Sequence, residues 1–257
     1  MTVFDPTVPN MARVYNYWLG GKDHYAADRD EAERLLAIYP PLRDLVRENR
    51  EFVTRAVIWA AGQGIGQFID LGTGLPAAPN IHQVARDADP AAKVAYVDLD
   101  PVVLVHARAL LATSDGVAVV GADLTDPAAV LAHPELRAVI DQAAPVAVIL
   151  GAALHFLDAL AARHVTAGYR QLVAPGSVVI ISVARHDDEL VAKQLADEYT
   201  AGRFVNHARA DIASFFAGLD MVGPGLTEAQ TWRPWIPAPV LRRRTGHVLA
   251  GIARRPA

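Results

Sequence analysis

The sequence predicts an α/β protein with a Rossmann-like, doubly wound and mostly parallel sheet, an antiparallel edge strand and an N-terminal helical extension. Short apolar runs typical of buried strands alternate with helix-compatible segments, which indicates βαβ units with right-handed crossovers. These runs lie at residues 68–71, 94–97, 117–120, 146–150 and 177–183. The last apolar segments are joined by loops, which favours an antiparallel addition at one sheet edge; they are residues 221–222, 232–239 and 247–253.

The composition excludes several classes of protein. The chain has 257 residues, of which 52% are hydrophobic, and this is enough for a large core. A formal net charge of −4 gives no electrostatic footprint for nucleic acid. There is no cysteine, so disulfides, thiolate metal sites and a cysteine nucleophile are excluded. No apolar run reaches the ~18 residues of a membrane span and no signal peptide is evident, so we expect a cytoplasmic protein without a membrane partner.

The segment before the first predicted strand, residues 1–66, forms the extension, and residues 67–257 form the sheet domain. Residues 11–19 are predicted to form a helix that ends at the two following glycines. Two more helices are expected over residues 28–38 and 42–61, the first ended by two prolines and the second with one apolar stripe. The extension has a dense set of aromatic side chains that either pack it onto the sheet domain or form a lid over a ligand: Tyr15, Tyr17, Trp18 and Tyr25.

Each of the first four predicted strands is followed by a segment compatible with a helix. Asp-Pro pairs at 100–101 and 126–127 place a capping side chain before a proline at the first helical position. The expected helices cover residues 80–88, 101–111 and 158–172, and another begins at residue 127. We therefore expect Asp100 to cap a helix rather than to bind a ligand.

The stretch Phe68–Pro76 is predicted to be a strand followed by a tight turn. The apolar run contains Asp70 near its end, and Gly72 and Gly74 allow backbone conformations that other residues avoid. Because a helix is expected to open at residue 80, free N–H groups near its start would favour negative charge. The stretch therefore predicts a cradle for a small molecule.

Acidic residues stand at the ends of three of the first four predicted strands, at Asp70, Asp98 and Asp123. Ligands of a doubly wound sheet bind beyond these carboxyl ends. The carboxylate of Asp98 can accept both hydroxyls of a ribose, whereas Asp123 either contacts a purine amino group or shapes a turn. The turn 151–155, after the fourth strand, belongs to the same edge.

Two ligand classes fit the glycine turn. Residues 72–77 match the relaxed G-x-G-x-x-G/A fingerprint of NAD(P) sites. Against NAD(P) stands Asp70, because an acid at this strand end repels a pyrophosphate and suits an ammonium group. A ribose at Asp98 and an ammonium near Asp70 indicate a nucleoside with an amino-acid tail, and S-adenosylmethionine fits this description.

Five motifs resemble, in order and spacing, those of class I S-adenosylmethionine-dependent methyltransferases. They are residues 68–74, 96–101, 122–124, 154–155 and 174–176. More narrowly, other segments resemble the actinobacterial "S-adenosyl methyltransferase" family, formerly described as a domain of unknown function: residues 12–29, 74–76, 80–82 and 133–136. The resemblance extends from about residue 11 to the end of the chain. It implies a methyltransferase whose cofactor is S-adenosylmethionine.

The resemblance also implies which residues hold the cofactor. They are the glycine turn with Asp70, Gly72, Thr73 and Gly74, the ribose acid Asp98 with Leu99, the adenine-side pair Asp123 and Leu124, and Gly151 and Ala152. We further expect residues of the extension to enclose the cofactor, namely Tyr15, Gly21, Lys22 and Arg29. Pro76 stands where many class I enzymes have a third glycine, and the fourth strand lacks an acidic or Asn-Pro-Pro-type motif. The acceptor therefore stays open, and we expect a small molecule.

His155, at a strand end beside the expected methyl group, is the candidate general base, although it can also simply shape the adenosine pocket. The other histidines lack a ligand spacing, so no metal is expected. A non-catalytic S-adenosylmethionine-binding regulatory or partner protein and an NAD(P)-dependent oxidoreductase remain alternatives. Segment 203–240 is rich in aromatic residues and either forms an acceptor pocket or dimer contact, or packs over the sheet edge.

Overall fold

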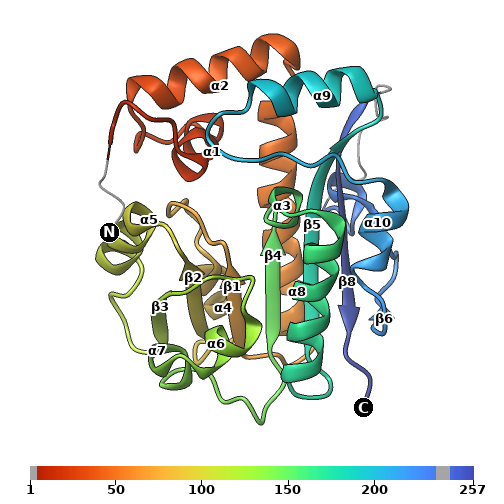
Figure 1. Cartoon of the computed structure of the whole chain (residues 1–257). Coiled ribbons are helices and arrows are strands. Elements are labelled where there is room, and N and C mark those ends of the chain that lie inside the picture. The colour runs from red at the N-terminus through yellow and green to blue at the C-terminus, as the bar shows by residue number, and fades with distance from the viewer. Residues whose placement is uncertain (1–4, 236–243) are drawn as a thin grey trace.

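The computed structural model describes residues 5–235 and 244–257. One sheet runs through this part of the chain in the order β3-β2-β1-β4-β5-β8-β6, with β7 also paired to β8 (Figure 1). Its strands are β1 (Gln67–Leu71), β2 (Lys93–Asp98), β3 (Val117–Gly121), β4 (Ala147–Gly151), β5 (Val178–His186), β6 (Asp220–Met221), β7 (Thr227–Glu228) and β8 (Gly246–Arg254). The predicted fold class is confirmed.

Parallel pairing joins β1 to β5, whereas β5, β6 and β7 each pair antiparallel with β8. β5 and β8 pair antiparallel over nine residues, from Val178 opposite Arg254 to His186 opposite Gly246. The apolar segment 232–239, expected near this edge, does not form a strand over 232–235, and its remainder lies outside the described residues. Trp232 is instead completely buried, with its ring 5.6 Å from that of Phe52.

The order of the strands creates an opening at their carboxyl ends. β1 pairs with β2 on one side and with β4 on the other. The connection that follows β1 therefore leads into one half of the sheet, and the connection that follows β4 leads into the other half. Such a switch point leaves a crevice beyond the carboxyl ends, where doubly wound proteins bind ligands.

Helices cover both faces of the sheet and the space beyond the carboxyl ends of its strands. They are α1 (Met11–Leu19), α2 (Ala26–Ile38), α3 (Leu42–Gly62), α4 (Ile81–Ala88), α5 (Pro101–Leu110), α6 (Pro127–Ala132), α7 (Pro134–Arg137), α8 (Ala159–Leu172), α9 (Glu189–Glu198) and α10 (Arg209–Ser214). Successive residues of β1 enter different cores, because strand side chains alternate between faces. Phe68 belongs to the same buried cluster as Ala56 of α3, whereas Ile69 belongs to the cluster that contains Val165 of α8. None of the helices in the described ranges is long and apolar enough to span a membrane.

The helices α1, α2 and α9 lie together beyond the carboxyl ends of the central strands (Figure 1). Glu31 of α2, which is completely buried, connects α2 to the segment after α9. Its carboxylate accepts hydrogen bonds from the Oγ1 of Thr200 at 2.8 Å and the backbone N–H of Ala201 at 3.1 Å. The extension is thereby attached to a segment far from it in the sequence.

A second buried carboxylate, Asp28, fixes the entrance to the extension. It accepts hydrogen bonds from the backbone N–H of Asn10 at 2.9 Å, from Nε of Arg13 at 2.8 Å and from the backbone N–H of Tyr25 at 2.7 Å. Asn10 in turn caps α1 through the N–H of Arg13. The start of α1 and the start of α2 therefore share one acceptor.

We expect Asp28→Ala to lower the free energy of unfolding by about 3 kcal/mol, because it removes a buried acceptor of three hydrogen bonds. Equilibrium unfolding in urea measures the effect. Asp30→Ala, an exposed acid of the same helix, is the matched control and should change the stability by less than about 0.5 kcal/mol. A loss below about 1 kcal/mol for Asp28→Ala would contradict the role given to this carboxylate.

Candidate active site

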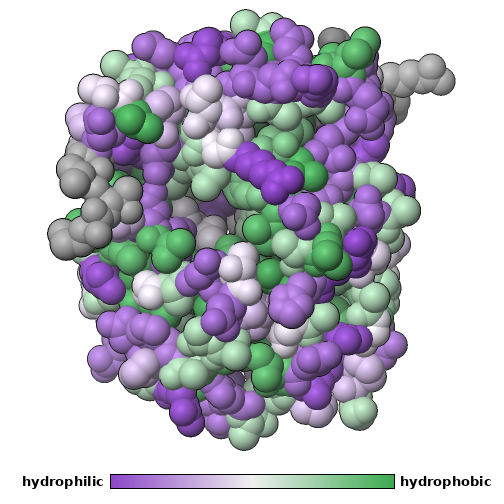
Figure 2. Space-filling view, in the orientation of Figure 1, coloured by the Kyte–Doolittle hydropathy of each residue, from purple (hydrophilic) through white to green (hydrophobic). Residues whose placement is uncertain are grey.

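A cavity of about 410 Å³ lies at the carboxyl ends of β1, β2 and β4, and the extension closes its far side. Figure 2 shows the surface hollowed between these two parts of the molecule. The size is within the range of small-molecule sites. The cavity joins the cradle predicted from the sequence to an apolar space beneath α1 and α3.

The glycine turn after β1 adopts the conformation that requires glycine. Gly72 has φ 69° and Gly74 has φ 65°, both in the left-handed region. The N–H groups of Gly72 and Thr73 donate to the carbonyl of Val97, at 2.9 and 3.2 Å, and the N–H of Gly74 donates to Asp98 at 3.0 Å. The turn is thus joined to the end of β2.

The expectation of free N–H groups at a helix start beside this turn is met only in part. α4 begins at Ile81, one residue from the predicted start, and the N–H groups of His82 and Gln83 already donate to the hydroxyl of Tyr96 and the carbonyl of Asn80, each at 3.0 Å. The N–H groups of Gly72, Thr73 and Gly74 already have partners within the protein. A negatively charged ligand group therefore needs a donor other than these.

Asp70 is the most deeply buried acid of the cavity, with 8% of its surface exposed. The Oγ1 of Thr73 donates to it at 2.6 Å. Burial raises the pKa of Asp70 to about 6, although the bond from Thr73 and the charge of Arg50 act in the opposite direction. A cationic ligand group beside Asp70 would relieve the cost of burying this carboxylate.

Asp98 follows at the end of β2 and organises the next turn. Its Oδ1 accepts the backbone N–H of Leu99 at 2.8 Å and of Asp100 at 3.0 Å, and burial raises its pKa. Leu99 lines the cavity and remains 64% exposed, so it offers an apolar surface to a ligand. Asp100 caps α5 through the N–H of Val102, as predicted. Its second oxygen accepts a hydrogen bond from Asn10 of the extension.

The ends of β3 and β4 complete this half of the cavity. Asp123 is exposed, and one oxygen accepts from both the N–H and the Oγ1 of Thr125. Leu124, Gly151 and Ala152 line the cavity with it. Ala152 has φ 58°, a left-handed conformation that costs a non-glycine residue energy.

A chain of buried polar groups connects Ala152 to the extension. The N–H of Ala152 donates to Oγ of Ser182 at 3.0 Å, and this hydroxyl donates to Oδ1 of Asn49 at 2.5 Å. The amide of Asn49 then donates to the hydroxyl of Tyr15 at 2.8 Å. Burial raises the pKa of Tyr15. These bonds hold α1, α3 and the β4 turn in a fixed arrangement around the cavity.

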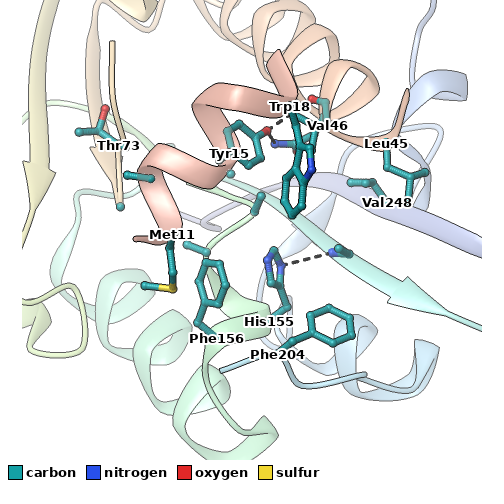
Figure 3. Close-up of a pocket in the computed structure, with 18 of the residues that line it drawn as sticks. Met11, Tyr15, Trp18, Leu45, Val46, Thr73, His155, Phe156, Phe204 and Val248 are labelled. Carbon is teal, nitrogen blue, oxygen red and sulfur yellow. Dashed lines mark hydrogen bonds between the residues drawn. The ribbon is translucent and has the colours of Figure 1, made fainter. Parts of the chain in front are cut away.

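His155 lines the cavity from the turn after β4 and is 7% exposed. The backbone N–H of Ala184 donates to its Nδ1 at 3.4 Å (Figure 3). Since Nδ1 is the acceptor, the proton of the neutral ring lies on Nε2. Burial, with a smaller contribution from His207, lowers the pKa of His155 to about 3. The ring is therefore neutral near pH 7 and has an N–H donor at Nε2.

The far half of the cavity is mainly apolar; Arg185 also lines the cavity, but its Nε donates to the carbonyl of His207 at 3.4 Å and its Nη1 pairs with Asp187. Figure 3 shows the ring of His155 between Tyr15 and Trp18 on one side and Phe156 and Phe204 on the other, with Leu45 and Val248 farther from Thr73. The four acids among the described lining residues all stand on the strand side of the cavity: Asp70, Asp98, Asp100 and Asp123. The cavity therefore has an acidic half and an apolar half.

The other three extension residues predicted to enclose the cofactor lie outside the cavity lining, which includes only Tyr15 of that set. A side chain at Gly21 would collide with Asn16, which explains the glycine by packing. Lys22 is exposed, and Arg29, also exposed, contacts His24 at 3.3 Å.

Among the lining residues that sequence reasoning missed are three polar ones of the extension, Asn16, Asn49 and Arg50. Asn49 had a usable signal, since it is a polar residue at helical spacing within the apolar stripe of α3. In segment 203–240, Phe204 lines the cavity, whereas Trp232 belongs to the core. In the part of the chain that the structure describes, no group of side chains could hold a metal ion.

The burial of Asp70 predicts a pH-dependent stability for the ligand-free protein. The pKa of Asp70 is about 6 in the folded state, compared with an ordinary value of 3.8. Between these pH values the folded state binds more protons than the unfolded state, so the free energy of unfolding falls as pH rises. The free energy of unfolding of Asp70→Asn, relative to that of the wild type, should therefore rise by about 2 kcal/mol from about pH 4 to about pH 7. Urea unfolding at both pH values measures this change. Asp87→Asn, an exposed acid of α4, is the control. A gain for Asp70→Asn that does not change with pH would contradict this account.

The arrangement fits a nucleoside that bears a charged amino-acid tail. Asp98 stands where a ribose acid is expected, Leu99 offers an apolar surface, and no atom lies within 4 Å of the place a side chain would occupy at Gly74. The buried carboxylate of Asp70 suits a cation. The residues present therefore fit S-adenosylmethionine better than a pyrophosphate.

Comparison with known proteins agrees with this fit. A protein from Thermobifida fusca YX, classed as a candidate methyltransferase, is 38% identical over 98% of this chain and 96% of its own, with a TM-score of 0.91. A DUF574 family protein from Streptomyces avermitilis MA-4680 is 34% identical over 98% and 99%, with a TM-score of 0.89. No curated protein matches the chain.

More distant structures show the same fold. Magnesium protoporphyrin IX methyltransferase from Synechocystis PCC 6803, solved with bound S-adenosylhomocysteine, has a TM-score of 0.54 at 15% identity, over 94% of this chain and 92% of its own. A family model described as S-adenosyl methyltransferase matches residues 2–256. The chain thus belongs to the S-adenosyl methyltransferase family, and S-adenosylmethionine is its cofactor.

Proposed function

We propose that this protein transfers the methyl group of S-adenosylmethionine to a small, uncharged and largely apolar acceptor, in the cytoplasm. The observation that carries the proposal is the division of one cavity into an acidic half at the strand ends and an apolar half beneath the extension. The acidic half suits a cationic nucleoside. The apolar half, directly continuous with it, suits the acceptor.

In this proposal the strand ends hold the cofactor. Asp98 binds the ribose hydroxyls, Asp70 binds the ammonium group, and Leu99 covers one face of the adenine. One oxygen of Asp123 is occupied by Thr125, which leaves the other for the adenine amino group. Tyr15 closes the site from the extension.

When bound, the cofactor supplies an electrophilic methyl group on a sulfonium, which is a good leaving group. The protein then mainly positions the acceptor and excludes water. Holding two reactants in near-attack geometry can supply roughly 7–11 kcal/mol of the barrier. The buried hydrogen-bond chain from Tyr15 through Asn49 to Ser182 keeps the walls of the site rigid enough for this role.

We infer a different role for His155 from that of a general base. Its Nδ1 lone pair is used by Ala184, its Nε2 has a proton, and its lowered pKa makes it a poor proton acceptor. His155 instead donates a hydrogen bond from Nε2 to the acceptor and orients the attacking atom. A hydroxyl acceptor that enters uncharged would lose its proton to solvent before methyl transfer, and a hydrogen bond from Nε2 would favour that deprotonated form.

The apolar half indicates the chemistry of the acceptor. Phe156 lies 4.4 Å from the ring of His155, and Phe204 lies 5.8 Å from it, so aromatic surfaces surround the donor. Tyr39 and His186 also line the cavity, but their polar atoms bond to Gly246, Asp188 and Thr245. A sugar or a polyamine would leave its polar groups unpaired here, which is costly.

Isothermal titration of ligand-free protein tests the cofactor. We expect S-adenosylmethionine and S-adenosylhomocysteine to bind, and Asp98→Ala to weaken both at least about 100-fold, because two hydroxyls lose a charged acceptor. Asp98→Asn, which can keep one oxygen for the N–H groups of Leu99 and Asp100 but replaces the oxygen that accepts from Gly74, should also bind weakly, whereas Asp87→Ala should bind like the wild type. Binding of NAD(P)H in place of both ligands would contradict the proposed function.

Release of S-adenosylhomocysteine with a panel of neutral hydroxylated and aminated arenes tests the acceptor and His155. With an acceptor found in this way, we expect His155→Ala to lower kcat about 10- to 100-fold, as loss of one transition-state hydrogen bond would. His155→Gln keeps an N–H donor and should retain more activity. Equal loss in both variants would favour a base instead, and turnover with polyamines but with no arene would contradict an apolar acceptor.

A further inference from the structure

Arg50 is a cation of the cavity that the proposed roles above do not use. It projects from α3, the last helix of the extension, and lines the cavity together with Asp70, Thr73 and Ala77. Its charge lies close enough to lower the pKa values of Asp70 and Tyr15, against the stronger effect of their burial. Arg50 therefore stands beside the place proposed for the amino-acid tail of the cofactor.

The protein satisfies only part of the guanidinium. The Nη2 of Arg50 donates to the carbonyl of Ala77 and to the carbonyl of Pro79, the latter at 2.7 Å. Its Nε is buried and has no hydrogen-bond partner among the described residues. No carboxylate in residues 5–235 or 244–257 lies within ion-pair distance of it; a guanidinium has five N–H donors in all.

The backbone N–H groups of the glycine turn already have acceptors within the protein. In many sites an anion binds to free N–H groups of a glycine turn or a helix start. Here the N–H groups of Gly72, Thr73 and Gly74 are bonded within the protein, and the start of α4 lies beyond Pro79. Arg50 is therefore better placed than these three N–H groups to bind an anionic group next to this turn.

We propose that Arg50 binds the carboxylate of the methionine part of S-adenosylmethionine, opposite Asp70, which binds the ammonium. The inference rests on the proposed function, because it concerns the same ligand. The two side chains form a pair of opposite charges that matches the two charges of an α-amino acid. A guanidinium also binds a carboxylate through two parallel N–H donors, which fixes its orientation.

A phosphate is the competing occupant for such a cation. The neighbouring carboxylate of Asp70 disfavours it, since a phosphate would bring further negative charge toward a buried acid that already carries a raised pKa. An α-amino-acid group has a net charge of zero and meets both side chains at once. The charge pattern therefore favours a zwitterion.

Isothermal titration with two ligands that differ only in the carboxylate tests this proposal. The ligands are S-adenosylmethionine and decarboxylated S-adenosylmethionine, and the variant is Arg50→Met, which keeps the apolar stem. We expect the variant to bind S-adenosylmethionine about 10- to 100-fold more weakly, as loss of a charge-assisted hydrogen bond would. Its affinity for the decarboxylated ligand should change less than about threefold, since that ligand has no group for Arg50.

The comparison of ligands separates recognition from support of the turn. Arg50→Met also removes the bonds to Ala77 and Pro79, and damage to the turn would weaken both ligands equally; that outcome overturns the proposal. An unchanged affinity for S-adenosylmethionine overturns it as well. Arg47→Met, an exposed arginine of the same helix outside the cavity, is the matched control and should change neither affinity. If the wild type binds neither ligand, the proposed function itself fails, which is a different result.

Discussion

The hydrogen bonds between the glycine turn after β1 and the end of β2 determine most of what this site can do. Val97 and Asp98 accept the N–H groups of three consecutive turn residues, which holds the two glycines in the left-handed region. The turn thereby keeps Asp70 buried at the strand end. It also uses the N–H donors of Gly72, Thr73 and Gly74, so Asp70 and Arg50 supply opposite charges beside the turn.

The extension provides what a doubly wound sheet alone lacks, a closed and apolar far wall. Buried polar groups attach it to the rest of the molecule at separate places, Glu31 near α9 and Asn49 through Ser182 of β5, while Asp28 joins the starts of its own first two helices. Satisfied buried networks of this kind impose one arrangement, because each broken bond would leave a polar group without a partner. The same arrangement places Trp18 and Tyr15 opposite His155 and gives this half of the cavity an aromatic wall (Figure 3).

Local patterns predicted the fold because each strand of the parallel sheet is a short, isolated apolar run, and Asp-Pro pairs mark the starts of α5 and α6. The edge beyond β5 was harder, since β6 and β7 have only two residues each and depend on pairing with β8. In the site, strand ends indicated Asp70, Asp98 and Asp123, but periodicity cannot show which helical side chain faces a distant turn. Arg50 was missed for that reason, and the division at residues 66 and 67 stays a prediction.

A crystal structure of the protein with S-adenosylhomocysteine tests the central claim most directly. The account predicts the ribose at Asp98 and the amino-acid tail between Asp70 and Arg50, with the sulfur facing His155 and the apolar half of the cavity. A ligand bound elsewhere, or bound at the strand ends with its carboxylate on backbone N–H groups and its sulfur directed away from the apolar half, would contradict it.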